Sequence, residues 1–251
     1  MKFIMNIFYF FEWLFSILQG KGFAGFRLSL NFEVKFILKL LSKNKNLVVL
    51  DVGANKGNFS SIFNKNSKNS EIHVIEPSLI NFEFLKKKFM NNINIRIANF
   101  AISNKNKNFK LFYDVKGSPL ASLNKRLFLG TKRKMTSYEI VKCTTLRKYI
   151  KENIKKKIID VIKLDTEGNE LNCLKSLSEK IKDVRLIQFE FGGCNIDSRN
   201  FFRDFWIFFK KKNFSIYRIG PFGLSKLINY SEADENFLTT NYLAKNNNFL
   251  S

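Results

Sequence analysis

The sequence predicts an α/β domain built on a mostly parallel β-sheet, and three observations support this prediction. From Leu47 onward, short runs rich in β-branched and aromatic residues alternate with longer amphipathic runs, which is typical of βαβ units. The runs at 47–50 and 158–164 are largely apolar without alternation, as in strands buried on both faces. Glycine or carboxylate residues follow several runs, at the sheet edge where ligands bind in open α/β folds.

Residues that start or stop a regular structure delimit the expected elements. The expected strands are 47–50, 71–75, 94–98, 108–113, 138–143, 158–164, 184–189, 215–219 and 237–244. The expected helices pass through residues 60–63, 82–89, 145–149, 171–177 and 200–211. Pro77 ends the second strand because proline cannot continue a central strand, and Ser78 is a suitable N-cap for the next helix. The fourth strand is expected in a hairpin-like excursion, and residues 114–136 form the longest loop, a natural lid or substrate loop.

Length and composition fit one domain with a small appendage. The 251 residues are 45% apolar and 15% aromatic, which excludes a disordered or collagen-like chain. We expect an N-terminal helical extension over residues 1–46 and the α/β domain over residues 47–251, where the strand pattern lies. His73 is the only histidine and is expected in the core, which leaves little for histidine-based catalysis or metal binding. Cys143, Cys173 and Cys194 form no CxxC pair, so we expect a reducing compartment and no metal site.

The formal net charge of +22 attracts polyanions and anionic lipid. The excess is mostly lysine, scattered together with asparagine, isoleucine and phenylalanine along the whole chain, which is typical of an AT-rich genome. The phenylalanine-rich stretch 201–209 has little interleaved arginine, and it indicates core packing rather than base stacking. We therefore expect a small-molecule or glycan partner and no nucleic acid.

The most informative stretch is Asp-Val-Gly-Ala-Asn-Lys-Gly at 51–57, which follows the first buried strand. Its glycines, Gly53 and Gly57, let a ligand approach the backbone and free the first N–H groups of the next helix. Glu76 ends the next strand, where a carboxylate can accept both hydroxyls of a ribose. The Gly-x-x-x-Gly spacing differs from a dinucleotide fingerprint and from a P-loop. The crevice therefore suits a nucleoside without a pyrophosphate, and S-adenosylmethionine (SAM) is the obvious candidate.

These stretches, together with others in the same order, resemble the FkbM family of SAM-dependent methyltransferases. The matching stretches lie at 48–57, 75–77, 98–103, 121–123, 144–149, 162–170 and 189–192, the sixth reading Ile-Lys-Leu-Asp-Thr-Glu-Gly-Asn-Glu. The resemblance spans residues 47–244 and implies a class I, Rossmann-like fold of three αβα layers, whose seven-stranded sheet has one antiparallel strand. It also implies methyl transfer from SAM, typically to a hydroxyl of a sugar, a surface glycan or a secondary metabolite.

The resemblance assigns cofactor-binding roles to several positions. Asp51, Gly53, Asn55 and Gly57 are implied to line the methionine end of SAM, and Glu76 its ribose. Many class I enzymes have an acidic residue near the adenine after the third strand. The corresponding residues here are Asn99, Phe100 and Ala101, so backbone and ring contacts to the adenine are expected instead.

Three residues at strand ends are the candidates for catalysis. Asp165 and Glu190 each end a buried strand above the expected crevice, and a close pair of carboxylates would raise one pKa and create a base for a hydroxyl proton. Lys163 interrupts an apolar run, so it needs a carboxylate partner such as Asp165 or Glu167. The alternatives are a nucleic-acid methyltransferase and a non-catalytic SAM-binding protein.

The N-terminal segment 3–18 is apolar on nearly every face but is shorter than a bilayer span and contains Glu12. A helix of this kind must bury more than one side. We expect it to pack on the domain and to meet either a second copy of the chain or a membrane surface. The expected location is the cytoplasm, with peripheral contact to the inner face of the membrane.

Overall fold

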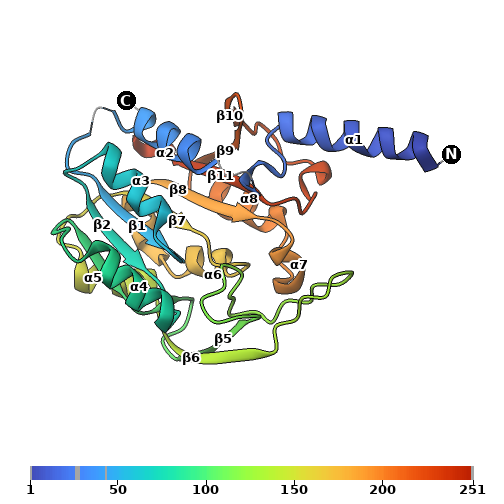
Figure 1. Ribbon diagram of the computed structural model, residues 1–251. Helices are drawn as coiled ribbons and strands as arrows, with labels where there is room; N and C mark the ends of the chain where they lie inside the picture. The colour runs from blue at the N-terminus through green and yellow to red at the C-terminus, as the bar shows by residue number, and fades with distance from the viewer. Residues whose placement is uncertain (1, 26–28, 43, 250–251) are drawn as a thin grey trace.

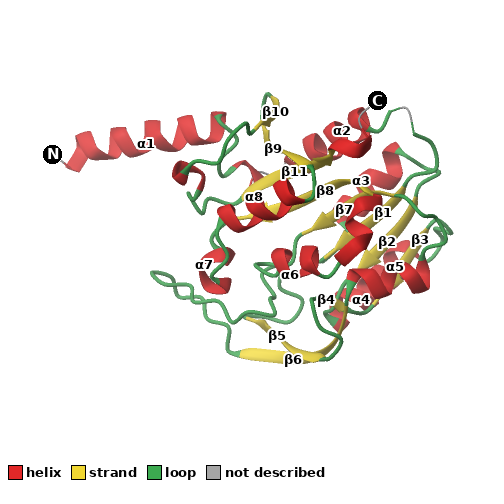
Figure 2. Cartoon of the chain, turned by 180° about the vertical axis from the view of Figure 1, so that it is seen from behind, coloured by secondary structure: helices red, strands yellow, loops and turns green. Residues whose placement is uncertain are grey.

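The structure, a computed structural model, is built on one central sheet with helices on both faces (Figures 1 and 2). It describes residues 2–25, 29–42 and 44–249. The strands of this sheet are β1 (Val48–Val52), β2 (Glu71–Ile75), β3 (Ile95–Ala98), β7 (Ile159–Leu164), β8 (Val184–Phe191), β9 (Phe214–Gly220), β10 (Gly223–Lys226) and β11 (Thr240–Asn246). The helices are α1 (Lys2–Leu18), α2 (Ser29–Leu40), α3 (Asn58–Asn66), α4 (Leu79–Phe89), α5 (Leu146–Asn153), α6 (Glu170–Lys175), α7 (Cys194–Ser198) and α8 (Phe202–Lys211).

The strand order confirms the predicted fold class. The order is β10-β9-β11-β8-β7-β1-β2-β3, and neighbouring strands from β8 to β3 pair in parallel. The expected antiparallel strand is β11, which runs against both β8 and β9. The sheet has eight strands among the described residues, one more than expected, because β10 folds back on β9 in a tight hairpin that pairs Gly220 with Gly223. The run Gly-Leu-Ser-Lys of β10 is too short and too polar to be predicted as a strand.

A second, smaller sheet contains the hairpin that was expected after the third strand. It consists of β4 (Ala101–Ile102), β5 (Asn108–Tyr113) and β6 (Ser137–Thr144), in the order β4-β6-β5. β5 and β6 pair antiparallel from Asn108 opposite Lys142 to Tyr113 opposite Ser137. The loop 114–136 therefore starts and ends at one point of the structure.

Two apolar clusters, one on each face of the main sheet, hold the three layers together. On one face, helices α5, α6 and α8 contribute the buried residues Tyr149, Leu174 and Phe205. On the other face, α2, α3 and α4 contribute Ile37, Phe63 and Leu85. Burial of such side chains contributes about 2 kcal/mol each, so both helical layers stabilise the sheet.

Helix α2 lies within the expected N-terminal extension and packs into the second of these clusters through Val34 and Ile37. Its Glu33 is buried and accepts hydrogen bonds from Gln188 Nε2 at 2.6 Å and Asn241 Nδ2 at 2.7 Å. α2 is thus joined to β8 and β11 by polar and apolar contacts. The domain boundary after residue 46 stays a prediction.

Helix α1 projects away from the body of the molecule (Figure 1). It covers the segment in which a helix was expected. Its C-terminal end is fastened to the domain, since Gly22 N donates to Thr240 Oγ1 at 2.9 Å. Among the described residues, no helix is both long and apolar enough to cross a membrane.

Candidate active site

The turn after β1 brings the strand ends of β1 and β7 into direct contact. Gly53 has φ +77°, and a Cβ on it would lie 1.9 Å from the carbonyl oxygen of Asp165. Gly53 N also donates to Ile75 O at 2.9 Å, which fixes the turn against β2. Only glycine can occupy this position, because both the backbone conformation and the space exclude a side chain.

Glu76, at the end of β2, holds this turn from the other side. Its Oε2 accepts from Asn55 N at 2.7 Å, and its Oε1 accepts from Ser78 N at 2.9 Å. The side chain is 5% exposed, and burial raises its pKa to about 7. The contacts with Asn55, Ser78 and the side chain of Asn81 leave acceptor capacity on the carboxylate for a ligand hydroxyl.

The stretch after β3 lies beside Glu76, as expected for the adenine side. Asn99 Nδ2 donates to the backbone oxygens of Glu76 and Pro77, both at 2.9 Å, and so fixes the β2 end. Phe100 and Ala101 line a hollow next to Glu76. Contact of these residues with an adenine stays a prediction.

The hollow between these turns offers groups that suit SAM. Gly53, Asn55 and Glu76 line it from β1 and β2, Asp165 and Glu167 from β7, and Pro119 from the loop 114–136. It adjoins a second hollow that shares Gly53, Asn55, Pro119 and Asp165 with it. The volume of the second hollow is about 310 Å³, at the lower end of the range of roughly 300–1,000 Å³ for small-molecule sites. Free acceptor oxygens at Glu76 and backbone accessible at a glycine turn fit the ribose and the amino-acid end of SAM.

Asp51 and Lys163 form a buried charge cluster next to the hollows. Asp51 is 1% exposed and accepts from Ser60 Oγ at 2.7 Å. Lys163 Nζ lies 2.9 Å from Asp165 Oδ2 and 3.7 Å from Asp51 Oδ1. Burial alone would lower the pKa of Lys163, but the two carboxylates raise it above its usual range, so the lysine stays charged. Lys163 has the predicted carboxylate partner and serves as a fixed positive charge.

Gly57 serves helix packing in this structure. It stands before α3 with φ +66°, and a Cβ on it would lie 2.6 Å from Leu85 and 2.7 Å from Phe89 on α4. Neither Gly57 nor Asp51 is among the described residues that line the two hollows. Their contact with the cofactor stays a prediction.

The carboxylates of Glu167 and Glu190 meet where β7 and β8 end. Together with Cys194 Sγ, their ligand atoms lie within 4.8 Å of one another. Burial and the charges of Asp165 and Glu167 raise the pKa of Glu190 well above its ordinary value, and burial and Asp165 also raise that of Glu167. Asp165, the predicted partner of Glu190, thus acts on it through its charge, and its own carboxylate pairs with Lys163. The absence of a metal site also stays a prediction.

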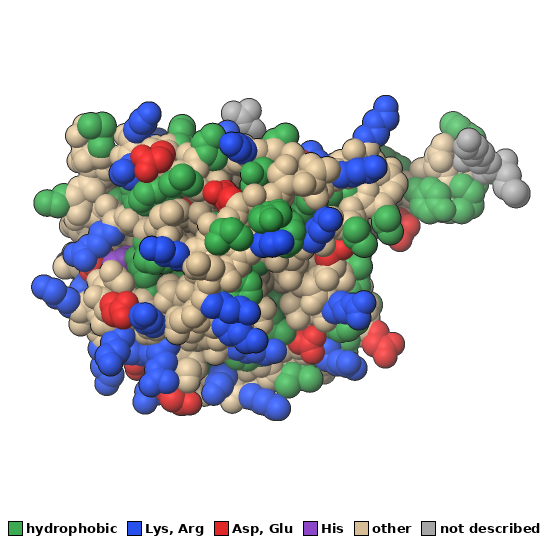
Figure 3. Space-filling view, turned by 90° about the horizontal axis from the view of Figure 1, so that it is seen from below, with side chains coloured by type: hydrophobic (Ala, Val, Ile, Leu, Met, Phe, Trp, Pro, Cys, Tyr) green, Lys and Arg blue, Asp and Glu red, His purple; other side chains and the backbone are tan. Residues whose placement is uncertain are grey.

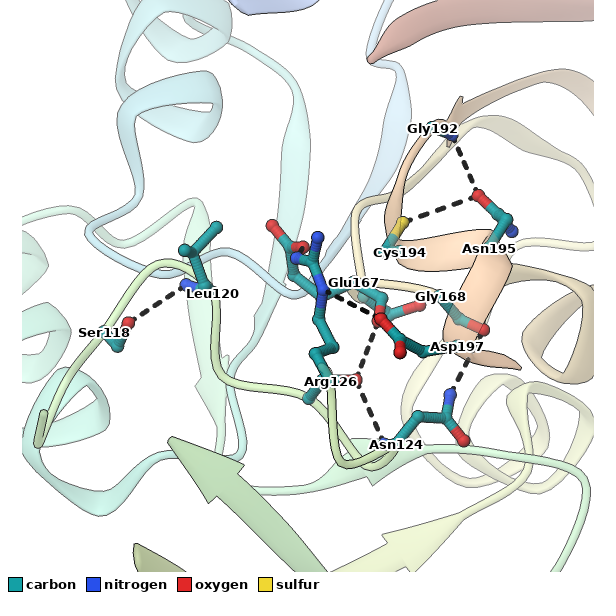
Figure 4. A network of polar contacts seen from close by, with 12 residues as sticks. Ser118, Leu120, Asn124, Arg126, Glu167, Gly168, Gly192, Cys194, Asn195 and Asp197 are labelled. Carbon is teal, nitrogen blue, oxygen red and sulfur yellow. Dashed lines mark hydrogen bonds and ion pairs between the residues drawn. The ribbon is translucent and has the colours of Figure 1, made fainter. Parts of the chain in front are cut away.

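Sequence reasoning did not include Glu167 and Arg126 among the site residues. The guanidinium of Arg126 contacts the carboxylate of Glu167 and lies 3.8 Å from Asp197 Oδ2 (Figure 4). Glu167 has φ +54°, a strained conformation that is concentrated at functional sites. Its position two residues after Asp165 was a usable signal, whereas Arg126 lies in a loop without any pattern.

Hydrogen bonds hold the loop 114–136 against the segment after β7 and against α7. Ser122 Oγ donates to Glu167 O at 2.7 Å, and Asn124 Nδ2 donates to Gly168 O at 3.3 Å. Leu127 N donates to Asp197 Oδ1 at 3.0 Å. These contacts, several of which are drawn in Figure 4, join the loop to α7 and cover one side of the cavity.

His73, the three cysteines and Glu170 have structural roles. His73 is fully buried, with Nδ1 3.0 Å from Tyr149 Oη and Nε2 3.1 Å from Glu71, as a satisfied core residue. The three cysteines are buried and free of disulfide bonds. Glu170 accepts from Thr166 N at 2.6 Å and Gly168 N at 3.0 Å, which makes it a structural residue at the start of α6.

The ends of β1, β2 and β7 thus bring a glycine turn, the buried carboxyl group of Glu76 and the acidic residues Asp165 and Glu167 to one cavity. Residues 51–216 match the family described as the Methyltransferase FkbM domain. The match covers more than half of the chain, so the chain belongs to the FkbM methyltransferase family.

Solved structures with a similar fold are methyltransferases of low sequence identity. The precorrin-6y C5,15-methyltransferase of Geobacter metallireducens is 8% identical, with a TM-score of 0.44, 84% of this chain covered and 86% of that one. A predicted methyltransferase of Streptococcus mutans, in complex with SAH, is 10% identical, with a TM-score of 0.46 and coverages of 87% and 96%. An rRNA methylase of Streptococcus thermophilus is 8% identical, with a TM-score of 0.47 and coverages of 85% and 93%. No curated protein matches the chain.

Proposed function

We propose that the protein transfers the methyl group of SAM to a hydroxyl oxygen of a small-molecule or glycan acceptor. The observation that supports this most is the Glu167–Glu190 carboxylate pair, of which Glu167 lines the cavity. A hydroxyl acceptor must lose a proton as the methyl group arrives, and a carboxylate with a raised pKa is a suitable base.

In this proposal, some residues bind the cofactor and others accept the proton of the acceptor. Glu76 accepts the ribose hydroxyls, and the turn at Gly53 and Asn55 presents its backbone to the amino-acid end of the cofactor. SAM supplies an electrophilic methyl group when it is bound. The ionised form of the Glu167–Glu190 pair takes up the proton of the acceptor hydroxyl, while Arg126 positions Glu167. Positioning of this kind provides a large part of the rate in a direct displacement.

Asp165 remains a second candidate for the base. Its carboxylate lines both hollows, but it is paired with Lys163 at 2.9 Å. Activity of Asp165→Asn within a few fold of wild type would exclude it from proton transfer.

The other proposals for this chain concern its location and the alternative functions. A cytoplasmic location suits the three free, buried cysteines. A nucleic-acid methyltransferase is favoured only by the net charge of +22. A non-catalytic SAM-binding protein would not need the Glu167–Glu190 pair.

The test uses SAM with a labelled methyl group and three fractions of the source cells: soluble metabolites, glycans with lipids, and total RNA. We expect label in one of the first two, as an ether that survives mild alkali, unlike a methyl ester. Glu190→Gln should lower the transfer by about 100-fold or more, the range of general base catalysis.

Exposed Glu152 on α5 offers a matched control, and Glu152→Gln should transfer at the wild-type rate. Calorimetry should show unchanged SAM binding by Glu190→Gln. Label found only in RNA would contradict the proposal in favour of the nucleic-acid alternative. No transfer to any fraction by a protein that binds SAM would favour the non-catalytic one.

A further inference from the structure

Two segments project from the body toward the side to which the strand β8 points (Figures 1 and 2). One is helix α1. The other is the tip of the loop 114–136, residues 125–134, with the sequence Lys-Arg-Leu-Phe-Leu-Gly-Thr-Lys-Arg-Lys. They are separate in the sequence, yet both views show them extending in the same direction. A single flat surface could therefore meet both.

Helix α1 exposes large apolar side chains in every direction. Phe8, Tyr9, Phe10 and Phe11 follow one another and are each exposed by 46–62%. Successive residues of an α-helix point about 100° apart, so these four alone cover nearly the full circumference. Figure 3 shows groups of hydrophobic side chains on the projecting segment. An apolar surface of this extent is not stable in water without a partner.

The distribution of these side chains favours a lipid partner over a second copy of the chain. A second helix packs along one stripe and would leave the remaining faces of α1 in water. Lipid surrounds an embedded helix on several sides at once. Glu12 is exposed on α1 between these aromatic residues and the body of the molecule, so it lies among the headgroups when the free end of the helix enters the lipid.

The loop tip has the composition of a segment that enters an anionic membrane. Leu127 and Leu129 are exposed by 67% and 86%. The exposed lysines Lys125, Lys132 and Lys134 flank them on both sides. Apolar residues enter the acyl region while lysines bind anionic headgroups, so the tip and the headgroups are complementary in charge.

We infer that α1 and the tip 125–134 together dock the protein on an anionic lipid bilayer. Docking at the tip also acts on the site, because the same loop lines the cavity through Pro119 and holds Glu167 through Arg126. The membrane therefore binds to the loop that shapes the candidate active site. This docking does not depend on the identity of the acceptor.

The test measures binding of the full-length protein to phosphatidylcholine vesicles with and without phosphatidylglycerol, by co-sedimentation. We expect binding that rises with the phosphatidylglycerol content. The triple variant Lys125→Gln, Lys132→Gln, Lys134→Gln should lower the partition coefficient by about 100-fold, at about fivefold per charge. The double variant Leu127→Ser, Leu129→Ser should lower the partition coefficient more than substitutions elsewhere on the surface do. The double variant Phe8→Ser, Phe10→Ser should do the same.

Phe222→Ser is the matched control for the apolar variants, since Phe222 is 84% exposed in the turn before β10. Lys65→Gln with Lys68→Gln is the control for the charge variants. Vesicle binding that is absent, or that these controls reduce as much as the tip variants, would overturn the inference. A dimer in sedimentation velocity that Phe8→Ser with Phe10→Ser dissociates would overturn it in favour of self-association. SAM calorimetry on the same variants should stay at the wild-type value, so a failed docking leaves the proposed function standing.

Discussion

Replacement of Gly53 by alanine tests the contact on which the candidate cofactor site is built. The new Cβ would lie 1.9 Å from the carbonyl oxygen of Asp165, far inside van der Waals contact. The oxygen belongs to the backbone and cannot rotate away. The ends of β1 and β7 must therefore separate, which affects the bonds from Asp165 N to Val52 O at 3.0 Å and from Gly53 N to Ile75 O at 2.9 Å.

The expected loss of stability can be estimated from these parts. A left-handed backbone costs an alanine about 1 kcal/mol relative to glycine, and two lost hydrogen bonds cost about 1 kcal/mol each. Gly53→Ala should therefore lower the free energy of unfolding by about 3 kcal/mol. Gly130→Ala isolates the backbone cost, because Gly130 has φ +75° and no atom within 4 Å of its added Cβ. Its expected loss is about 1 kcal/mol.

Equilibrium urea unfolding, followed by far-ultraviolet circular dichroism, measures both losses. SAM calorimetry on the folded Gly53→Ala protein should also show weakened binding, because the turn that presents Asn55 has moved. Equal losses of stability in the two variants would refute the reasoning, since they would show that the contact with Asp165 carries no cost.

Three further variants test the buried charges. Glu76 has a pKa raised from 4.5 to about 7, so its contribution to stability is complete below about pH 4.5 and is lost as the pH rises through 7. The free energy of unfolding of the wild type, measured with urea, should therefore decline between pH 5 and pH 8, and Glu76→Gln should remove about 3 kcal/mol of that decline. An equal decline in the wild type and the variant would contradict this prediction. Glu170→Ala leaves the N–H groups of Thr166 and Gly168 unpaired and should lower the free energy of unfolding by about 3 kcal/mol, whereas the exposed control Glu179→Ala should lower it by less than about 0.5 kcal/mol. Equal urea midpoints for the two variants would contradict this prediction. Lys163→Met leaves Asp51 and Asp165 without their cation and should cost about 3 kcal/mol in the same assay, whereas a more stable variant would show that the cluster is not needed.

The main sheet could be predicted because its strands are short, continuous apolar runs with clear terminators. Pro77 and Ser78 mark the end of β2 and the start of α4 at the residues where the structure has them. β10 could not be predicted, because pairing with β9 rather than its own composition makes it a strand. Helix α2 was not separated from the apolar N-terminal region, because its packing partners on β8 and β11 lie far away in the sequence.

In the candidate site, residues that directly follow a strand could be predicted, whereas contacts between residues far apart in the sequence could not. The glycine turn and Glu76 are visible in the sequence because each directly follows a strand. The partner of Glu167 is Arg126, 41 residues earlier, in a loop whose composition indicates only flexibility. Which carboxylates meet at the end of a sheet depends on the register of β7 and β8, and one sequence does not contain that register.

Calorimetric titration with SAM and with SAH tests the central claim most directly, since it asks whether the cavity beside Glu76 is the cofactor site. Wild type should bind each ligand with one site per chain. Glu76→Ala should bind about 100-fold more weakly, because two charge-assisted hydrogen bonds to the ribose are lost, while Glu83→Ala on the exposed face of α4 should bind like wild type. Circular dichroism confirms that both variants are folded. No heat of binding at high micromolar SAM, or equal affinity in wild type and Glu76→Ala, would contradict the account.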